Sequence, residues 1–552
     1  MSPNPIDPLE GPQLAVRGRV VCMDATFRVL DDATVYIEKG AIAAVVPKGA
    51  AAPNGFENVE VVPTRGTIFP GLIELHNHLS YNALRLWDVP KQYTNRDTWA
   101  GTPEYRQLIS GPMQVVGKTP GLLPAVVRYV ETKCLFGGVT TSQGIQLFSN
   151  AGARRYYRGI VRNVEQTDEA DFPEAATKIA DVEAADIEKF HQRLLRQSCF
   201  LLHLSEGTDK AARQHFLALQ KPDGTWAITP ALTGIHCAAL QPADFAVLGS
   251  HGGAMVWSPL SNLLLYGATA HVEAARRAKI LIGLGSDWSP SGSKNLLGEL
   301  KVARLVSANL GDVFSDREII AMATTNAASI LQWDKVLGSL EAGKRADLIV
   351  VAGTSGDAYA TLLESKETDI RLVMINGVAR YGMSSLMEQF NAGGEKVRVG
   401  GSGRLLFLEQ KTADEVVGKM SLSQASETLD EALDNLPALA EQLEHPAMPA
   451  PGRLTARPEQ VTWSLALDEI QETGVDLRPR LPFAGHAHTG PRRVPMSGPA
   501  LAAAVAKPLS EIVKPLQLDP LTVADEKEFL LNIANEDNLP PFIVSGLKKL
   551  YS

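Results

Sequence analysis

Short apolar runs that end in polar residues recur along the first half of the chain. Five of these runs end in side chains that can bind a metal ion or a substrate: His76 with His78, His203 with Glu206, His236, Ser258 to Asn262, and Asp287. An apolar run of about four to eight residues is typical of a buried strand, and the stretches between the runs are long enough for helices. Polar residues at the carboxyl ends of successive buried strands predict a (β/α)8 TIM barrel.

The first of these runs is the most informative one. Residues 66–75 lead through a Pro-Gly pair into His76 and His78. Side chains alternate across a strand, so two histidines separated by one residue point in the same direction. Two converging neutral imidazoles can bind a divalent metal ion, and zinc or iron suits them. A second such pair, His486 and His488, lies in a proline-rich segment where we expect no site.

Short strands are also predicted on both sides of the barrel. Asn376-Gly377 between two β-prone runs is a strong hairpin signal. We expect one small β-sandwich built from both chain ends, with strands at residues 14–23, 33–38, 41–46, 347–351 and 371–378. The predicted division is residues 1–66 for the first half of the sandwich, 67–336 for the barrel and 337–400 for the second half.

Residues 401–552 form a predicted C-terminal extension. It combines an acidic amphipathic helical stretch at residues 412–443 with a segment rich in proline and glycine at 446–499. Residues 521–551 are again predicted to be helical, with an interruption at Pro540-Pro541. Two roles stay open for this part: a subunit contact that makes a homo-oligomer, or a cover over the active site.

Composition and charge narrow the class of protein. The 552 residues are 45% hydrophobic, with no apolar run long enough to cross a membrane, and the start of the chain lacks a signal core. The net charge of −9 argues against nucleic acid as a partner. The four cysteines are scattered, as in a cytoplasmic protein with reduced thiols; Cys237 adjoins His236 but is expected to face away from it. We therefore expect a small-molecule substrate and neither a nucleic-acid nor a membrane partner.

The ordered set of motifs resembles the amidohydrolase superfamily. The likeness extends over residues 12–382 and is strongest to the branch of cytosine, guanine and adenosine-type deaminases and of triazine hydrolases and chlorohydrolases. The resemblance implies one divalent metal ion, zinc or iron, bound by His76, His78, His203 and Asp287. It also implies that Glu206 and His236 transfer protons or polarise the substrate.

One departure from the family pattern concerns the number of metal ions. Binuclear members carry a carbamylated lysine at the end of strand four. The expected strand four of this chain is residues 177–182, where Lys178 stands at the start. A mononuclear site is therefore predicted.

The resemblance implies a metal-dependent hydrolase that acts on a carbon–nitrogen bond, other than a peptide bond, of a cyclic or heteroaromatic molecule. In this hypothesis Asp287 takes a proton from the attacking water, Glu206 protonates the ring nitrogen and His236 polarises the forming oxyanion. Removal of a ring chloride or alkoxy group, or opening of a cyclic amide or carbamate, would use the same site. A non-catalytic scaffold is disfavoured because every metal ligand of the family is present.

Several candidate residues also have structural explanations. His203 taken alone is more typical of a core histidine than of a ligand, and Glu206 could stabilise a helix N-terminus. In the loop after His78, aromatic and basic residues could contact a planar, charged substrate or simply pack the loop onto the barrel; they are Trp87, Tyr93, Arg96 and Trp99. Asn262 is expected to support the barrel mouth, with substrate contact as the alternative.

Overall fold

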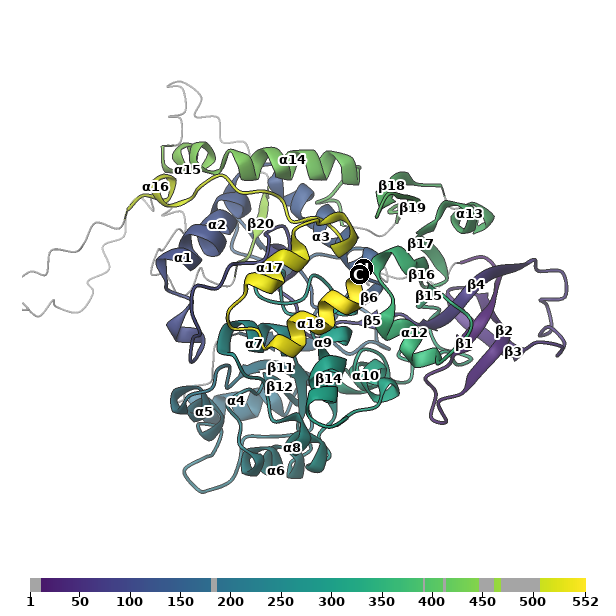
Figure 1. Cartoon of the computed structure of the whole chain (residues 1–552), viewed down its shortest axis with the longest axis horizontal. Helices are drawn as coiled ribbons and strands as arrows, with labels where there is room; N and C mark the ends of the chain where they lie inside the picture. The colour runs from purple at the N-terminus through teal and green to yellow at the C-terminus, as the bar shows by residue number, and fades with distance from the viewer. Residues whose placement is uncertain (1–10, 180–185, 391–392, 411–413, 446–460, 468–506) are drawn as a thin grey trace, which may run out of the picture.

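Eight parallel strands form the centre of the molecule. The computed structural model describes residues 11–179, 186–390, 393–410, 414–445, 461–467 and 507–552 (Figure 1). A three-stranded and a five-stranded group of parallel strands follow in chain order. They are β5 (Leu72–Ile73), β6 (Val139–Ser142) and β9 (Arg162–Asn163), then β10 (Ala175–Lys178), β11 (Cys199–Leu204), β12 (Leu232–His236), β13 (Ala254–Trp257) and β14 (Ile282–Leu284).

Backbone hydrogen bonds join the two groups into a barrel. Ala175 N donates to Val164 O at 2.8 Å, and Leu75 N donates to Leu284 O at 3.3 Å. The strands alternate with helices, which include α3 (Leu122–Phe136), α4 (Ile187–Leu194), α5 (Lys210–Leu217), α6 (Pro242–Ser250), α7 (Pro259–Tyr266), α8 (Val272–Arg277) and α9 (Leu296–Asn309). This is the TIM-barrel-like α/β fold predicted from the sequence.

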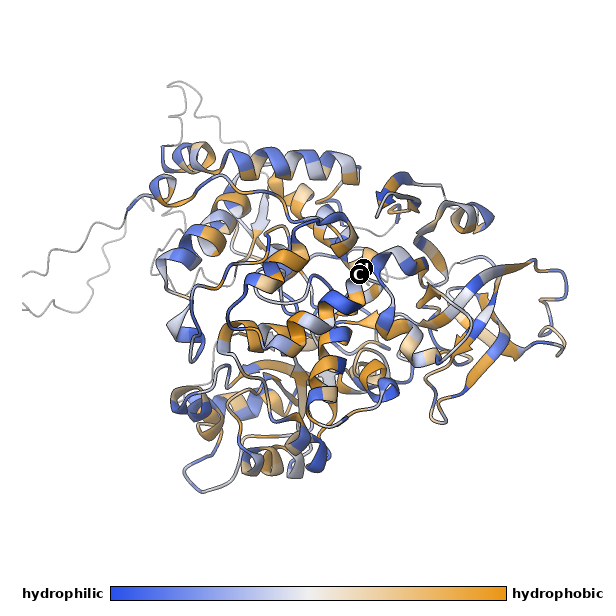
Figure 2. Cartoon of the chain, in the orientation of Figure 1, coloured by the Kyte–Doolittle hydropathy of each residue, from blue (hydrophilic) through white to orange (hydrophobic). Residues whose placement is uncertain are grey.

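The barrel interior is apolar beneath the polar strand ends. Leu201 on β11 clusters with Ile73, Ile235 and Val256 from three other strands. Side chains alternate along a strand, so His203 lies on the same face as Leu201, two positions nearer the carboxyl end. Figure 2 shows hydrophobic positions concentrated in the interior and hydrophilic positions on outer surfaces such as that of α5.

Strands from both chain ends pair in one nine-stranded sheet, in the order β18-β19-β17-β16-β15-β4-β1-β2-β3. They are β1 (Leu14–Val21), β2 (Val29–Glu38), β3 (Ala41–Pro47), β4 (Val61–Pro70), β15 (Leu348–Ala352), β16 (Ile370–Ile375), β17 (Val378–Met383), β18 (Glu395–Val399) and β19 (Ser402–Leu406). The antiparallel pairing of β4 with β15 joins the two ends of the chain. The predicted pairing between the ends is therefore confirmed.

The run before the first histidines is two strands, whereas the sequence predicted one. Residues up to Pro70 belong to β4 of the large sheet, and only Leu72–Ile73 belong to the barrel. Gly71 separates them, and a side chain there would approach the Thr140 side chain to 2.3 Å. The chain therefore passes from sheet to barrel at Gly71, a few residues later than the predicted boundary.

Strand four also differs from its prediction. It is β10, Ala175–Lys178, so Lys178 stands at its end and the expected position at the start was wrong. Register places Thr177 beside Leu201, whose side chain faces the barrel interior. Alternation therefore directs Lys178 away from the interior, while Ile179 lines the active-site cavity. A mononuclear site stays a prediction, which the direction of the Lys178 side chain supports.

The C-terminal part packs along one side of the barrel. It contains α14 (Leu422–Asp434), α15 (Leu436–Glu444), β20 (Trp463–Leu465), α16 (Leu509–Ile512), α17 (Phe529–Asn535) and α18 (Pro541–Tyr551). Helix α14 contacts α3, and α18, drawn in yellow, contacts α9 (Figure 1). Residues 486–488 lie outside the described residues. Among the described residues no helix combines the length and apolar character needed to cross a membrane.

A buried ion pair between the barrel and the large sheet yields a stability prediction. Arg162 of β9 and Asp347, just before β15, are 2.7 Å apart and almost fully buried. Asp347→Ala leaves a buried guanidinium without its carboxylate, which typically costs about 3–5 kcal/mol in the free energy of unfolding. Chemical denaturation measures this loss. The control Arg276→Ala breaks an exposed pair with Glu318, and its expected cost is below about 1 kcal/mol; equal losses would contradict the prediction.

Candidate active site

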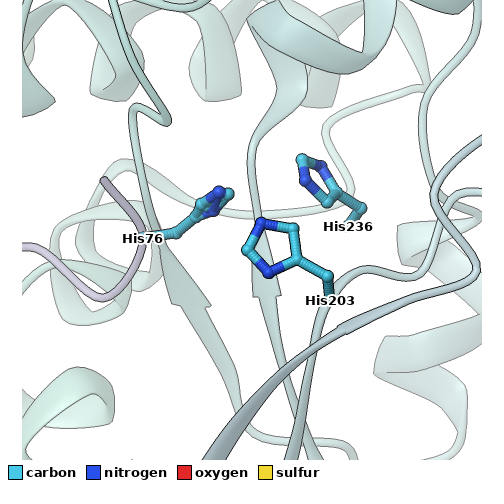
Figure 3. Close-up of side chains that lie close together, drawn as sticks. All are labelled: His76, His203 and His236. Carbon is cyan, nitrogen blue, oxygen red and sulfur yellow. The ribbon is translucent and has the colours of Figure 1, made fainter. Parts of the chain in front are cut away.

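Four histidines and one aspartate converge at the carboxyl ends of the barrel strands. Their rings and carboxylate come from the segment after β5, from β11 and β12, and from the segment after β14. His76 Nε2 lies 3.3 Å and His78 Nε2 3.5 Å from Asp287 Oδ1. The ring centroid of His76 lies 4.7 Å from that of His203 and 4.8 Å from that of His236. Figure 3 shows these last three rings facing a common space.

The histidine nitrogens have the character of metal ligands. Both ring nitrogens of His76 and the Nδ1 atom of His203 lack a hydrogen-bond partner among the described residues. Both side chains are nevertheless buried. Buried polar groups normally have such partners. Burial, reinforced by the neighbouring imidazoles, holds the pKa of His76 and of His203 well below the ordinary value. Both rings are therefore neutral, as metal binding requires.

Two overlapping groups of potential ligands share His76. One contains His203 and His236, and the other contains His78 and Asp287; within each group the ligand atoms lie within 4.8 Å of one another. The donor set of imidazole nitrogens and carboxylate oxygen suits zinc or iron. The residues present therefore fit the divalent ion that the sequence predicted.

Unusual backbone angles accompany the site. Ser205, His236, Cys237 and Asp287 all have positive φ, between 51° and 65°. Few residues other than glycine adopt this left-handed region, and such strain concentrates at functional sites. Each of these residues lies where a barrel strand ends, so the bends set the direction of the polar side chains.

Hydrogen bonds orient two members of the cluster. Ser261 Oγ donates to Asp287 Oδ2 at 2.7 Å, and burial raises the pKa of Asp287. His236 Nδ1 lies 2.9 Å from Asn262 Oδ1. Because an amide oxygen can only accept, this contact places a proton on His236 Nδ1. Asn262 therefore supports His236, which fits its expected supporting role.

Glu206 faces the cluster from the loop after β11. Its Oε2 lies 3.7 Å from His236 Nε2, and its Oε1 accepts a hydrogen bond of 2.7 Å from the Tyr266 hydroxyl. Glu206 does not stabilise a helix N-terminus, because Asp209 caps α5. Tyr266 itself accepts a hydrogen bond of 2.8 Å from Trp99 Nε1. Tyr266 was not predicted, since nothing in its local sequence distinguishes it from a buried helical tyrosine.

A cavity opens above the cluster and Glu206. Its further walls include Arg96, Trp99, Tyr105, Ile179 and Trp288. Three aromatic side chains and one guanidinium thus surround the space next to the potential metal ligands. Trp288 and Tyr105 were not predicted, although the position of Trp288 directly after Asp287 was a usable signal.

The loop after His78 divides between the two expected roles. Arg96 and Trp99 line the cavity, whereas Trp87 and Tyr93 do not. Trp87 and Tyr93 are buried and pack near each other, with ring centroids 6.1 Å apart. Their role as substrate contacts has no support in the geometry; they pack the loop onto the barrel.

Cys237 points away from the cluster, as expected. Its thiol is buried and donates a hydrogen bond of 3.4 Å to Gly234 O. Burial also raises the pKa of the thiol far above its ordinary value. A thiolate ligand at this position is therefore disfavoured.

Comparison with known sequences places the chain near one enzyme family. A family model described as the amidohydrolase family matches residues 205–380. A 5-methylthioadenosine/S-adenosylhomocysteine deaminase of Symbiobacterium thermophilum is 24% identical over 387 residues, covering 60% of this chain and 84% of the relative. A second deaminase of the same name, from Syntrophus aciditrophicus, is 24% identical over 70% of this chain and 97% of its own length.

Solved structures support the fold. An atrazine chlorohydrolase from Arthrobacter aurescens in complex with zinc has a TM-score of 0.53 at 20% identity, covering 66% of this chain and 94% of its own. An adenosine deaminase from Xanthomonas campestris with bound zinc has a TM-score of 0.50 at 17% identity, covering 78% of this chain and 99% of its own. At these identities the likeness shows the barrel fold alone.

The ligand geometry predicts the metal content of the purified chain. We expect about one tightly held divalent ion, and we expect His203→Ala to lose it because removing one ligand opens the site. Elemental analysis measures both. The control His271→Ala alters a half-exposed histidine outside the cluster and should retain the ion. A reproducible stoichiometry of two ions per chain would contradict the mononuclear prediction.

Proposed function

We propose that this chain, whose resemblance to the amidohydrolase superfamily is confirmed, is a metal-dependent hydrolase that deaminates a heteroaromatic small molecule. The observation that carries the proposal is the convergence of buried, neutral imidazoles and Asp287 beside Glu206, at the mouth of a barrel. The reaction adds water across a ring C=N bond and breaks the bond to the exocyclic nitrogen. The products are a ring carbonyl compound and ammonia.

The proposed ligands of the metal ion are His76, His78, His203 and Asp287. Zinc is the first candidate, since the similar deaminase and chlorohydrolase structures are described as zinc-bound. A divalent ion held there supplies the Lewis acidity that makes a water molecule nucleophilic near neutral pH. We assign His236 to the substrate side because its Nε2 is directed toward Glu206.

Three side chains then have separate tasks in proton transfer. Asp287 accepts a proton from the attacking water and passes it to the exocyclic nitrogen, which then leaves as ammonia. Glu206 delivers a proton to the ring nitrogen next to the attacked carbon, and general acid–base help of this kind is worth about 10²–10⁴-fold. His236 stabilises charge at the new oxygen, and its orientation is fixed by Asn262.

The cavity walls suggest the substrate class. Trp99, Tyr105 and Trp288 offer aromatic faces and edges to a planar ring, and Arg96 can meet a carbonyl or anionic group. The similar sequences are named as deaminases of 5-methylthioadenosine and S-adenosylhomocysteine. Aminated purines and their nucleosides are therefore the first substrates to test.

A second candidate function uses the same site on a different leaving group. The likeness in fold to an atrazine chlorohydrolase makes ring dechlorination or dealkoxylation the alternative. Product analysis separates the two, since deamination releases ammonia and the alternative releases chloride or an alcohol.

Each part of the fold has its own proposed role. We propose that the barrel, from Leu72 to about residue 336, performs the chemistry, while the nine-stranded sheet of β1 to β4 and β15 to β19 is an accessory domain and the described helices after β19 form an extension. A homo-oligomer stays a prediction for this extension, and analytical ultracentrifugation of the full chain tests it.

The proposed reaction predicts the behaviour of Glu206→Gln. Glutamine keeps the size of the side chain but cannot transfer a proton, so turnover should fall about 10²-fold or more while metal content and thermal stability stay near those of the wild type. Ammonia release from a panel of aminated heterocycles measures turnover. The control Glu273→Gln changes a partly exposed carboxylate outside the cluster. Normal turnover by Glu206→Gln would exclude the proton relay.

Tyr266→Phe tests the support of Glu206. The substitution removes one hydroxyl and with it the hydrogen bond to the carboxylate, an interaction with a charged group worth about 1.5–3 kcal/mol. We expect kcat to fall between about 10- and 100-fold with little change in metal content. The control Tyr359→Phe removes a hydroxyl that bonds to Phe27 O, remote from the cavity. An unchanged kcat for Tyr266→Phe would show that Glu206 needs no such support.

A further inference from the structure

A buried ion cluster joins the C-terminal part of the chain to the barrel. Asp519 lies between two ammonium groups: its Oδ2 contacts Lys133 of α3, and its Oδ1 lies 2.6 Å from Lys294. Lys294 also lies 2.6 Å from Glu526. All four side chains are buried. Buried ion pairs often contribute little net stability, so their value lies in fixing one arrangement of the parts they join.

Lys133 connects this cluster to both loops that carry proposed metal ligands. Its Nζ donates to Asn82 O at 2.9 Å and to Ser289 Oγ at 2.7 Å. Asn82 belongs to the loop after His78, and Ser289 follows Asp287 by two residues. The loops also bond to each other, because Ser289 N donates to Asn82 Oδ1 at 2.8 Å. The Lys133 ammonium group therefore holds the two loops in a fixed position relative to each other.

The hydrogen bonds continue from Asn82 to the ligands' immediate neighbours. Asn82 Nδ2 donates to Asn77 Oδ1 at 2.9 Å, and Asn77 Nδ2 donates to Ser286 Oγ at 3.1 Å. Asn77 stands between His76 and His78, and Ser286 directly precedes Asp287. Such outer partners orient metal ligands, and their loss typically costs about 10–100-fold in metal affinity or activity.

The same C-terminal segment fixes the loop that forms part of the cavity wall. Asp519 N donates to Ala83 O at 2.9 Å, and Arg85 Nε donates to Leu518 O at 3.3 Å. Val89 N donates to Glu536 Oε2 at 3.3 Å. This loop continues to Arg96 and Trp99 at the cavity. In Figure 1 the yellow segment runs past α3 toward α17 and α18, across the elements that carry these contacts.

We propose that the Asp519–Lys133 pair is a positioning device by which the C-terminal extension completes the metal centre. Asp519 supplies the buried counter-charge that keeps Lys133 in place, and Lys133 fixes Asn82 and Ser289 and thereby the loops of His76, His78 and Asp287. The extension is in this view part of the active site, although none of its described residues lines the cavity. The proposal rests on the proposed metal-dependent function.

The test compares variants of the full-length chain. Asp519→Asn removes the charge that holds Lys133, and Glu526→Gln removes one carboxylate from the same cluster without touching Lys133. Both change the net charge of the cluster by the same amount, so they are matched. The double variant Lys133→Met/Asp519→Asn leaves no unpaired charge between these two positions but still lacks the bonds to Asn82 and Ser289.

Three measurements are made on each variant: thermal unfolding, retention of zinc against a chelator, and hydrogen–deuterium exchange of peptides covering residues 76–89 and 284–292 in the metal-free protein. Asp519→Asn should retain zinc about tenfold or more less tightly and exchange faster in both peptides, whereas Glu526→Gln should resemble the wild type in both respects. The double variant should regain thermal stability while zinc retention stays weak.

Each contrary result has a distinct meaning. If zinc retention and exchange in Asp519→Asn match those of Glu526→Gln, or if the double variant regains zinc retention together with stability, the pair is merely structural and the proposal is overturned. If the wild type itself binds no zinc, the proposed function fails; hydrogen exchange in the metal-free protein then still decides whether the pair positions the two loops.

Discussion

The site is built around buried imidazoles, and ring nitrogens of His76 and His203 lack hydrogen-bond partners among the described residues. Burying a polar nitrogen without a hydrogen bond is costly, and here both nitrogens of His76 and one of His203 are in that state. Nothing in the barrel core requires histidines at these positions, because apolar residues such as Leu201 fill the layer beneath. A divalent ion would turn this cost into binding energy, which explains why the residues are present. Burial and the neighbouring imidazoles lower their pKa values.

The barrel meets this constraint by placing each ligand at a strand end and then bending the backbone. Left-handed angles at Ser205, His236 and Asp287 direct the side chains inward. A further layer of bonds holds the bends: Glu74 Oε1 accepts from Ser286 N at 2.6 Å, directly before Asp287. Burial raises the pKa of Glu74 to about 7. The hydrogen bonds of Asn262, Ser261 and Asn77 act in the same way. The residues that surround the ligands therefore determine the geometry of the centre.

The sequence predicted the barrel and the five clustered residues from one local pattern, an apolar run followed by a polar residue. It predicted the pairing of the chain ends from short β-prone runs. It failed where a position depends on contacts distant in sequence. Gly71 separates two strands at a place where a side chain would collide with Thr140, and strand four begins two residues before its predicted start. Tyr266 contacts Glu206 and Asp519 contacts Lys133 only in the folded chain. No local sequence pattern marks either residue. Trp87 and Tyr93 are aromatic residues of the kind expected in a substrate-binding loop, but both are buried and pack the loop onto the barrel.

The central claim is a single metal ion held by three imidazoles and one carboxylate, and X-ray absorption spectroscopy of the zinc-loaded chain tests it most directly. We expect only nitrogen and oxygen atoms bound to the metal, at about 2.0–2.2 Å, with the multiple scattering that imidazole rings produce. A sulfur scatterer at about 2.3 Å would contradict it by placing a cysteine on the metal. A second metal at about 3.5–4 Å would contradict it by showing a binuclear centre.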